Sequence, residues 1–353
     1  MRARFDEPSW WYGDGEAAGR RLRRSAAAGC LAPLGALYGW VARTRYARAE
    51  PYRARLPVVC VGNLTAGGTG KTPLTLHLCR HLQGAGLHPA VLTRGYGGSH
   101  AGPHWVAEGD GADAVGDEAL LLARAAPTLV CRDRAAGAQA IEARAACDVI
   151  VMDDGLQNPQ LAKDLTLAVV DGTRGLGNGR VMPAGPLRAP LGFQLGLVDA
   201  IVVNARAPSA GDAVADRLRG RFDGPILRCA TVVAGDTAWF NGRRVVAWAG
   251  VAAPQRFFAM LRSLGAEVAE TIAFADHERL TEADARRLLA LAERSGATLV
   301  STAKDMARLT GTAGALAALA GATRVLPITL HFAAPDAERL AALMDGAMGR
   351  KRG

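Results

Sequence analysis

The chain has 353 residues, half of them apolar, and a formal net charge of +9. This length suffices for two ordinary domains with a sizeable core. Its six cysteines form no C-x-x-C pair and show no His/Cys ligand spacing, which excludes a disulfide framework and a structural zinc site and indicates a reducing compartment.

Most of the positive charge lies near the N-terminus. Residues 19–55 contain nine arginines against a single acid, Glu50, so the rest of the chain is nearly neutral. A nucleic-acid-binding module would spread basic residues over a fold, and here only this cluster supports that alternative. Between the two arginine groups lie 17 uncharged residues, 26–42, preceded by Trp10-Trp11-Tyr12. This composition is typical of a segment held at an anionic membrane surface.

The uncharged segment is too short to span a bilayer comfortably. Seventeen helical residues reach only about 25 Å, against a hydrocarbon core of roughly 30 Å, and Pro33 and three glycines weaken the helix. We therefore expect residues 1–50 to form a segment that lies in one leaflet, peripheral or monotopic. A buried helix of the globular body is the alternative; a cleaved signal peptide is disfavoured by arginines at both ends.

From residue 57 onward, short apolar runs alternate with helical patterns, which predicts βαβ units and a parallel sheet flanked by helices. Strands are expected at 57–62, 90–93, 128–131, 149–152, 165–170 and 200–203, and helices near 72–84, 117–126, 133–146 and 211–219. We assign residues 51–205 to this core and 206–353 to a second, smaller α/β lobe. In the lobe we expect strands at 226–233, 244–248 and 298–301, and helices at 254–264, 281–294, 313–322 and 336–348.

A glycine-rich stretch, Asn63-Leu-Thr-Ala-Gly-Gly-Thr-Gly-Lys-Thr72, follows the first strand. Backbone amides of such a loop, together with a helix N-terminus, bind phosphate. Lys71 can reach the β- and γ-phosphates, and the Thr72 hydroxyl can bind Mg²⁺. The strict G-x-x-x-x-G-K-[ST] pattern fails, because Thr65 occupies the first glycine position. The nucleotide site is therefore predicted at Thr65, Ala66, Gly67, Gly68, Thr69, Gly70, Lys71 and Thr72.

Two acids follow the strand predicted at 149–152. Asp153 and Asp154 are candidates for the metal site, and we expect the chain to turn at Gly155 so that both approach it. An Asp-Gly turn with solvated acids is the alternative.

Seven motifs resemble, in order, those of the tetraacyldisaccharide 4′-kinase family, the lipid A kinases of Gram-negative bacteria. They are GNLTAGGTGKTP (62–73), TRGYGG (93–98), VGDEALLLA (115–123), DDGLQ (153–157), GNGRVMPAGPLR (177–188), FADH (274–277) and TAKD (302–305). Together with the basic N-terminus they cover most of the chain. The resemblance implies an ATP- and Mg²⁺-dependent transfer of phosphate to the 4′-hydroxyl of a tetraacylated disaccharide 1-phosphate, at the cytoplasmic face of the inner membrane.

The resemblance also implies residue roles. Lys71 and Asp154 act in catalysis, Thr72, Asp153 and Asp154 hold the metal, and Asp117 is the base for the sugar hydroxyl, with His277 orienting it or sharing its proton. Contacts to the lipid substrate are expected from Arg94, Tyr96, Glu118, Arg134, Gln157 and Arg188. Three positions depart from the family pattern: Asn158, Glu278 and Ala303.

The main rival is a membrane-peripheral P-loop NTPase or GTPase regulator. Guanine recognition uses [NT]-K-x-D, and Thr302-Ala-Lys-Asp305 differs from it by placing the lysine one position late.

Overall fold

The computed structural model describes residues 8, 10–12, 18–144, 146–276 and 278–349. It divides into two compact units: residues 1–75, 142–231 and 330–353 form the first, and residues 76–141 and 232–329 form the second. Each unit is thus assembled from separate segments. The boundaries expected after residues 50 and 205 remain a prediction.

The first unit contains a parallel sheet with the strand order β8-β7-β6-β1-β5, and β13 lies beside β8. Its strands are β1 Val58–Asn63, β5 Val149–Asp153, β6 Leu165–Asp171, β7 Ala200–Ala205, β8 Ile226–Val233 and β13 Ile328–Phe332. Every residue of β1, β5 and β6 is buried, as expected for strands covered on both faces.

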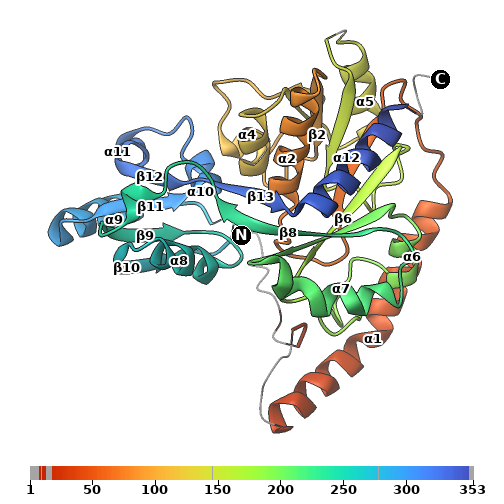
Figure 1. The fold of residues 1–353 in the computed structure, drawn as a ribbon, viewed down its shortest axis with the longest axis horizontal. Coiled ribbons are helices and arrows are strands. Elements are labelled where there is room, and N and C mark those ends of the chain that lie inside the picture. Colours follow the sequence, from red (N-terminus) through yellow and green to blue (C-terminus); the bar gives the residue numbers. More distant parts are fainter. Residues whose placement is uncertain (1–7, 9, 13–17, 145, 277, 350–353) are drawn as a thin grey trace. The chain divides into compact units, whose positions relative to one another are not determined.

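Helices cover this sheet on opposite sides (Figure 1). Its helices are α1 Ala18–Ala47, the start of α2 Lys71–Gly84, α6 Leu191–Leu195, the short η1 Pro208–Gly211, α7 Asp212–Arg219 and α12 Ala334–Gly349. Leu195 of α6 and Val214 and Leu218 of α7 pack with Val170 and Val203 of the sheet, whereas α12 packs against β1 and β6.

The second unit contains a parallel four-stranded sheet with the order β10-β9-β11-β12, and a small group in which β4 pairs with β2 and β3. Its strands are β2 Pro89–Thr93, β3 His104–Trp105, β4 Thr128–Val130, β9 Arg244–Ala249, β10 Glu267–Ala273, β11 Thr298–Thr302 and β12 Thr323–Leu326. Its helices are the remainder of α2, α3 Ala112–Val115, α4 Asp117–Ala123, α5 Arg134–Glu142, η2 Ala238–Phe240, α8 Pro254–Ser263, α9 Glu282–Ser295, α10 Ala303–Arg308 and α11 Gly314–Ala322. The last residue of α5, Glu142, belongs to the first unit.

Strand β9 forms the centre of a three-layer arrangement. Val245 and Ala247 pack with Phe258 of α8 on one face, and Val246 and Trp248 pack with residues of α9 and α11 on the other. The alternation follows from the two-residue period of a strand. The fold is therefore the expected α/β class, with a P-loop-type parallel sheet and a second, smaller α/β sheet.

Helix α1 is longer than the uncharged segment and continues through Pro33. Its glycines have a packing role: a Cβ at Gly35 would lie 2.7 Å from the Val181 carbonyl oxygen, and a Cβ at Gly39 would lie 2.9 Å from Pro190. No helix within the described part of the chain is long and apolar enough to cross a membrane.

The carboxylate of Glu142 fixes the segment that leads into β1. It accepts a 2.6 Å hydrogen bond from the Tyr52 hydroxyl and further bonds from the backbone amides of Arg55 and Leu56. Burial tends to raise the pKa of Glu142, but these bonds hold it below its ordinary value.

We expect Glu142→Gln to lower the free energy of unfolding by about 1 kcal/mol at pH 7. Because the pKa is lower in the folded state, the contribution is present above the unfolded-state value of about 4.5 and is lost as the pH falls through the folded-state value. Urea unfolding at pH 7 and pH 4 should show that the difference between wild type and variant narrows at the lower pH. A constant difference would contradict this assignment.

Candidate functional site

The loop between β1 and α2 has the conformation of a phosphate-binding loop. Gly67 and Gly70 adopt φ values of +96° and +98°, which favour glycine. A Cβ at Gly70 would also lie 2.4 Å from Asn204 Nδ2. The Asn63 side chain supports the loop from inside, since its Nδ2 donates to the carbonyls of Thr65 (2.6 Å) and Gly67 (3.3 Å). Helix α2 then begins at Lys71.

Backbone hydrogen bonds connect the motif at 177–188 to this loop. The Ala66 amide donates to the Pro186 carbonyl (2.8 Å), and the Arg188 amide donates to the Leu64 carbonyl (3.0 Å). This contact explains why the motif belongs to a nucleotide site although it lies more than 100 residues further along the chain.

Two glutamines fix the same loop from within the first unit. Gln157 Nε2 donates to the Asn63 carbonyl and to Gln194 Oε1, both at 2.8 Å, and Gln194 Nε2 donates to the Leu64 carbonyl at 3.1 Å. Gln157, predicted to contact substrate, therefore supports the loop in this structure; its substrate contact stays a prediction.

The N-terminal tryptophans pack on the same motif. Trp11 is only 1% exposed, the indole nitrogens of Trp10 and Trp11 both donate to the Pro183 carbonyl, and the Asn178 amide donates to the Trp11 carbonyl. Trp11 of the aromatic run before the uncharged segment is thus buried against this motif; membrane association of residues 1–50 stays a prediction.

The two acids after β5 have different partners. Asp153, which lies opposite Val61 of β1, accepts a 2.9 Å hydrogen bond from Thr75 Oγ1 of α2, and both residues are buried. Asp154 lies 3.6 Å from Lys71 Nζ and accepts bonds of 3.0 and 3.2 Å from Arg188 Nη1. The chain turns at Asp154, whose φ is +52°, and not first at Gly155 as expected.

The donor set fits a magnesium nucleotide. Mg²⁺ takes hard oxygen ligands, commonly one or two carboxylates together with substrate phosphates, and Thr72, Asp153 and Asp154 supply such oxygens. In addition, the buried hydroxyl of Thr69 has no hydrogen-bond partner among the residues that the structure describes. An unsatisfied donor in the loop suits a phosphate oxygen. Thr72, Asp153 and Asp154 would hold the Mg²⁺ ion, which when bound neutralises charge at the phosphates.

A second polar cluster lies in the second unit, around the start of α4. Asp117 is 5% exposed; its Oδ1 accepts a bond from the Glu118 amide, and its Oδ2 accepts a 2.8 Å bond from Arg308 Nε of α10. Lys304 Nζ lies 3.3 Å from Glu118 Oε1 and 3.4 Å from Asp276 Oδ1. His277 lies outside the described residues.

Two pKa values in this cluster are displaced. Burial tends to lower the pKa of Lys304, but the carboxylates of Glu118, Asp117 and Asp276 outweigh it and raise the pKa above its ordinary value. Burial raises the pKa of Asp305, and Arg308 and the Thr302 hydroxyl oppose the shift. The pKa values of Lys304 and Asp305 thus depend on the charged groups beside them.

The glycines of RGYGG let this segment approach residues 114–116, directly before α4. A Cβ at Gly95 would lie 2.9 Å from the Val115 carbonyl, and a Cβ at Gly116 would lie 2.4 Å from the Tyr96 carbonyl. Tyr96 is 64% exposed and Arg94 is exposed, so both are accessible to a ligand.

Arg134, also predicted to contact substrate, has a different environment. It is 2% exposed and donates to the Cys131 carbonyl. Its contact to a lipid phosphate stays a prediction.

A buried strand, a glycine-rich loop with Lys-Thr at the start of a helix, and an acid-bearing strand paired with the first define a P-loop nucleotide-binding protein. Within that class, the chain belongs to the tetraacyldisaccharide-1-P 4′-kinase family, whose model matches residues 27–348.

Relatives named tetraacyldisaccharide 4′-kinase match nearly the whole chain. The protein of Methylobacterium nodulans is 46% identical over 342 residues, which are 95% of this chain and 96% of that protein. A protein of Methylorubrum extorquens is 50% identical over 323 residues, 91% and 94% of the two chains. The crystal structure of LpxK from Aquifex aeolicus in complex with ATP has the same fold, with a TM-score of 0.71, 23% identity, and coverage of 91% of this chain and 99% of that one.

Among the groups that contact predicted site residues and that sequence reasoning missed are Thr75, Lys304 and Arg308. The TAKD motif, considered above only for guanine recognition, contains Lys304, and Thr75 lies one turn after Lys71. Arg308 carried no sequence signal.

Proposed function

We propose that the protein is an ATP-dependent lipid kinase that transfers the γ-phosphate to the 4′-hydroxyl of tetraacyldisaccharide 1-phosphate in lipid A biosynthesis. The observation that carries this proposal is the arrangement of Lys71, Asp154 and Arg188 at a P-loop in a chain of this kinase family. Two cations converging on one carboxylate can also neutralise the charge of a triphosphate.

In the reaction, the bond between the γ-phosphorus and the β,γ-bridging oxygen breaks and a bond to the 4′-oxygen forms. Lys71 and Arg188 stabilise the transferring phosphoryl group, and Asp117 with His277 takes up the hydroxyl proton. Thr72, Asp153 and Asp154 would hold Mg²⁺, which would neutralise charge on the phosphates. The amides of residues 65–72 bind the phosphates. Arg94, Tyr96 and Glu118 bind the sugar and its 1-phosphate, and Arg134 and Gln157 complete this substrate set.

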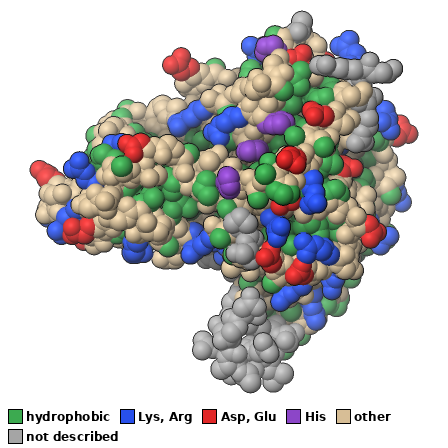
Figure 2. All heavy atoms as spheres, viewed as in Figure 1, with side chains coloured by type: hydrophobic (Ala, Val, Ile, Leu, Met, Phe, Trp, Pro, Cys, Tyr) green, Lys and Arg blue, Asp and Glu red, His purple; other side chains and the backbone are tan. Residues whose placement is uncertain are grey.

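The rival GTPase hypothesis is weakened by the surroundings of Asp305. This residue is fully buried, and its carboxylate accepts bonds from the Gly250 amide (3.0 Å), Thr302 Oγ1 (2.6 Å) and Arg308 Nη1 (2.8 Å). An aspartate engaged in this way is not available to recognise a guanine. We propose no nucleic-acid partner, because basic residues are concentrated in residues 19–55 and are not spread over the fold; on the face seen in Figure 2, cations and anions are interspersed.

The function is tested by incubating the purified protein with Mg-ATP and the disaccharide lipid in detergent. We expect a product heavier by one phosphate, and none from an acceptor without a free 4′-hydroxyl. GTP in place of ATP tests the rival. GTP hydrolysis without modification of the lipid would overturn the proposal in favour of a regulator.

The acceptor is a lipid, and α1 is suited to approach it. Leu34, Leu37, Tyr38 and Val41 form one stripe at i, i+3, i+4 and i+7, each 47–57% exposed, and Trp40 beside them is 63% exposed. Such a stripe on a basic segment is typical of a helix that lies in a membrane interface. We propose that α1 binds the cytoplasmic face of the inner membrane.

We expect the double variant Leu37→Glu/Trp40→Glu to shift the protein from anionic phospholipid vesicles to the supernatant in a sedimentation assay, by tenfold or more in the partition ratio. The physical reason is the loss of about 2–4 kcal/mol of apolar transfer per replaced side chain. Ile328→Glu is the matched control, because Ile328 is an exposed apolar residue outside α1. Unchanged sedimentation of the double variant would remove α1 as the membrane contact.

A further inference from the structure

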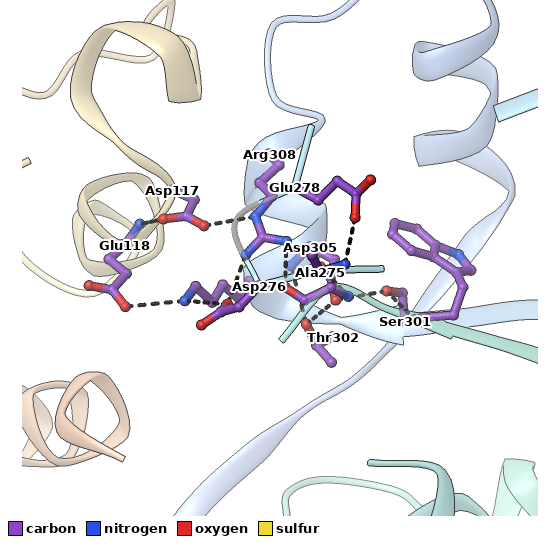
Figure 3. A network of polar contacts seen from close by, with 12 residues as sticks. Asp117, Glu118, Ala275, Asp276, Glu278, Ser301, Thr302, Asp305 and Arg308 are labelled. Atoms are coloured by element: carbon purple, nitrogen blue, oxygen red, sulfur yellow. Dashed lines mark hydrogen bonds and ion pairs between the residues drawn. The ribbon is translucent and has the colours of Figure 1, made fainter. Parts of the chain in front are cut away.

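Helix α10 presents two cations toward α4. Lys304 and Arg308 are four residues apart, so they lie one turn apart on the same face of the helix. Figure 3 shows Arg308 with Asp117, Glu118 and Asp276 in one polar network. Both helices and the Asp276 loop belong to the second unit.

Arg308 makes the central contacts. Its side chain is 7% exposed; Nε donates to Asp117 Oδ2 at 2.8 Å, and Nη1 donates to the Gly250 carbonyl at 2.7 Å and to Asp305 Oδ1 at 2.8 Å. Nη2 lies 3.6 Å from Asp276 Oδ1. One guanidinium therefore contacts the predicted base and the residue that precedes His277.

Lys304 makes a second link between the same two segments, because its ammonium group forms ion pairs with both Glu118 and Asp276. The two cations thus link the Asp117-Glu118 pair to the 274–276 loop twice.

Helix α10 is itself firmly held. Thr302 caps its first turn by accepting a bond from the Asp305 amide, and the Asp305 carboxylate accepts a bond from the Gly250 amide at the end of β9. The Asp305 side chain is fully buried. Lys304 and Arg308 therefore lie on a helix that hydrogen bonds fix to the carboxyl ends of β9 and β11.

We infer that Arg308 is a positioning residue for Asp117: it fixes the Asp117 carboxylate in one orientation and ties α4 to the segment that leads to Asp276. This inference rests on the proposed function and assigns a role to a residue outside the motifs that imply it. A lysine could not replace it fully, since one ammonium group cannot make the same fork of contacts in the same plane.

The test is a double-mutant cycle measured by initial rates of phosphate transfer. We expect Arg308→Met to lower kcat by about 100-fold, the scale of a misplaced catalytic group, with the KM for ATP unchanged. Arg308→Lys should retain part of the rate and provides a variant that folds if the methionine variant does not. In an Asp117→Asn background, Arg308→Met should lower the remaining rate by less than about threefold, because its effect passes through Asp117.

Arg279→Lys is the matched control: Arg279 pairs with Asp113 of the same unit, and both side chains are about 70% exposed. It should leave the rate unchanged. Equal losses from Arg308→Met in the wild-type and Asp117→Asn backgrounds would overturn the inference, because a purely structural residue acts independently of Asp117. Absence of phosphate transfer by the wild-type protein would overturn the proposed function itself.

Discussion

Replacing Lys71 by methionine is expected to lower kinase turnover by about 10³-fold, the loss seen when one preorganised charge stabiliser is removed from an active site. Lys71 lies at the first position of α2, is 12% exposed and faces Asp154 at 3.6 Å. When nucleotide binds, the ammonium group can exchange this carboxylate for the phosphates. Its loss removes a positive charge that the transition state needs more than the ground state does.

The variant should remain folded, since Asp154 keeps its two hydrogen bonds from Arg188. Thermal unfolding checks this, and kcat with the lipid acceptor gives the effect. Arg80→Met is the control, because Arg80 is an exposed cation on the same helix. Turnover within tenfold of wild type for Lys71→Met would mean that the loop does not bind the transferred phosphate.

The central strands could be predicted from the sequence because they are continuous apolar runs. Strands β1, β2, β4, β5, β6 and β7 occur within one or two residues of the expected ranges. Strand β10, Glu267–Ala273, was not predicted: it lies at a sheet edge, no residue in it is fully buried, and it carries two glutamates. An edge strand has one neighbour and needs no apolar pattern.

The nucleotide loop and its acids could be predicted because their residues are adjacent in sequence and their chemistry is distinctive. The supports of the loop could not be predicted in the same way. Pro186 and Gln194 act through a backbone carbonyl and an amide, and neither group marks a sequence position as special. Arg308 is 191 positions from Asp117, so only the fold brings the two together.

Helix α1 shows a related limit. Gly35 and Gly39 weaken a helix by propensity, yet their missing side chains are what let the helix approach the loops at Val181 and Pro190. Packing outweighs helix propensity at these two glycines. The sequence alone therefore predicted an exposed apolar segment, but it did not predict which face of the helix packs against the protein.

Asp117→Asn is expected to lower turnover by 10²- to 10⁴-fold, the range for a lost proton acceptor, while ATP affinity stays within about twofold of wild type. The amide keeps the shape of the carboxylate and one acceptor oxygen, but it cannot take up the proton of the sugar hydroxyl. Arg308 retains Asp305 and the Gly250 carbonyl as partners. The free energy of unfolding should therefore fall by no more than about 1–3 kcal/mol.

The measurement combines kcat for the lipid acceptor with a separate titration of ATP binding, so that loss of chemistry is distinguished from loss of nucleotide. Asp113→Asn is the matched control, because this acid lies four residues earlier and its side chain is 71% exposed in its pair with Arg279; exposed pairs of this kind contribute only about 0–1 kcal/mol. Wild-type turnover of Asp117→Asn would remove Asp117 from the chemistry. The carboxylate would then serve only to balance Arg308, and the proton acceptor would have to be sought among the other acids of the cluster, Glu118 and Asp276.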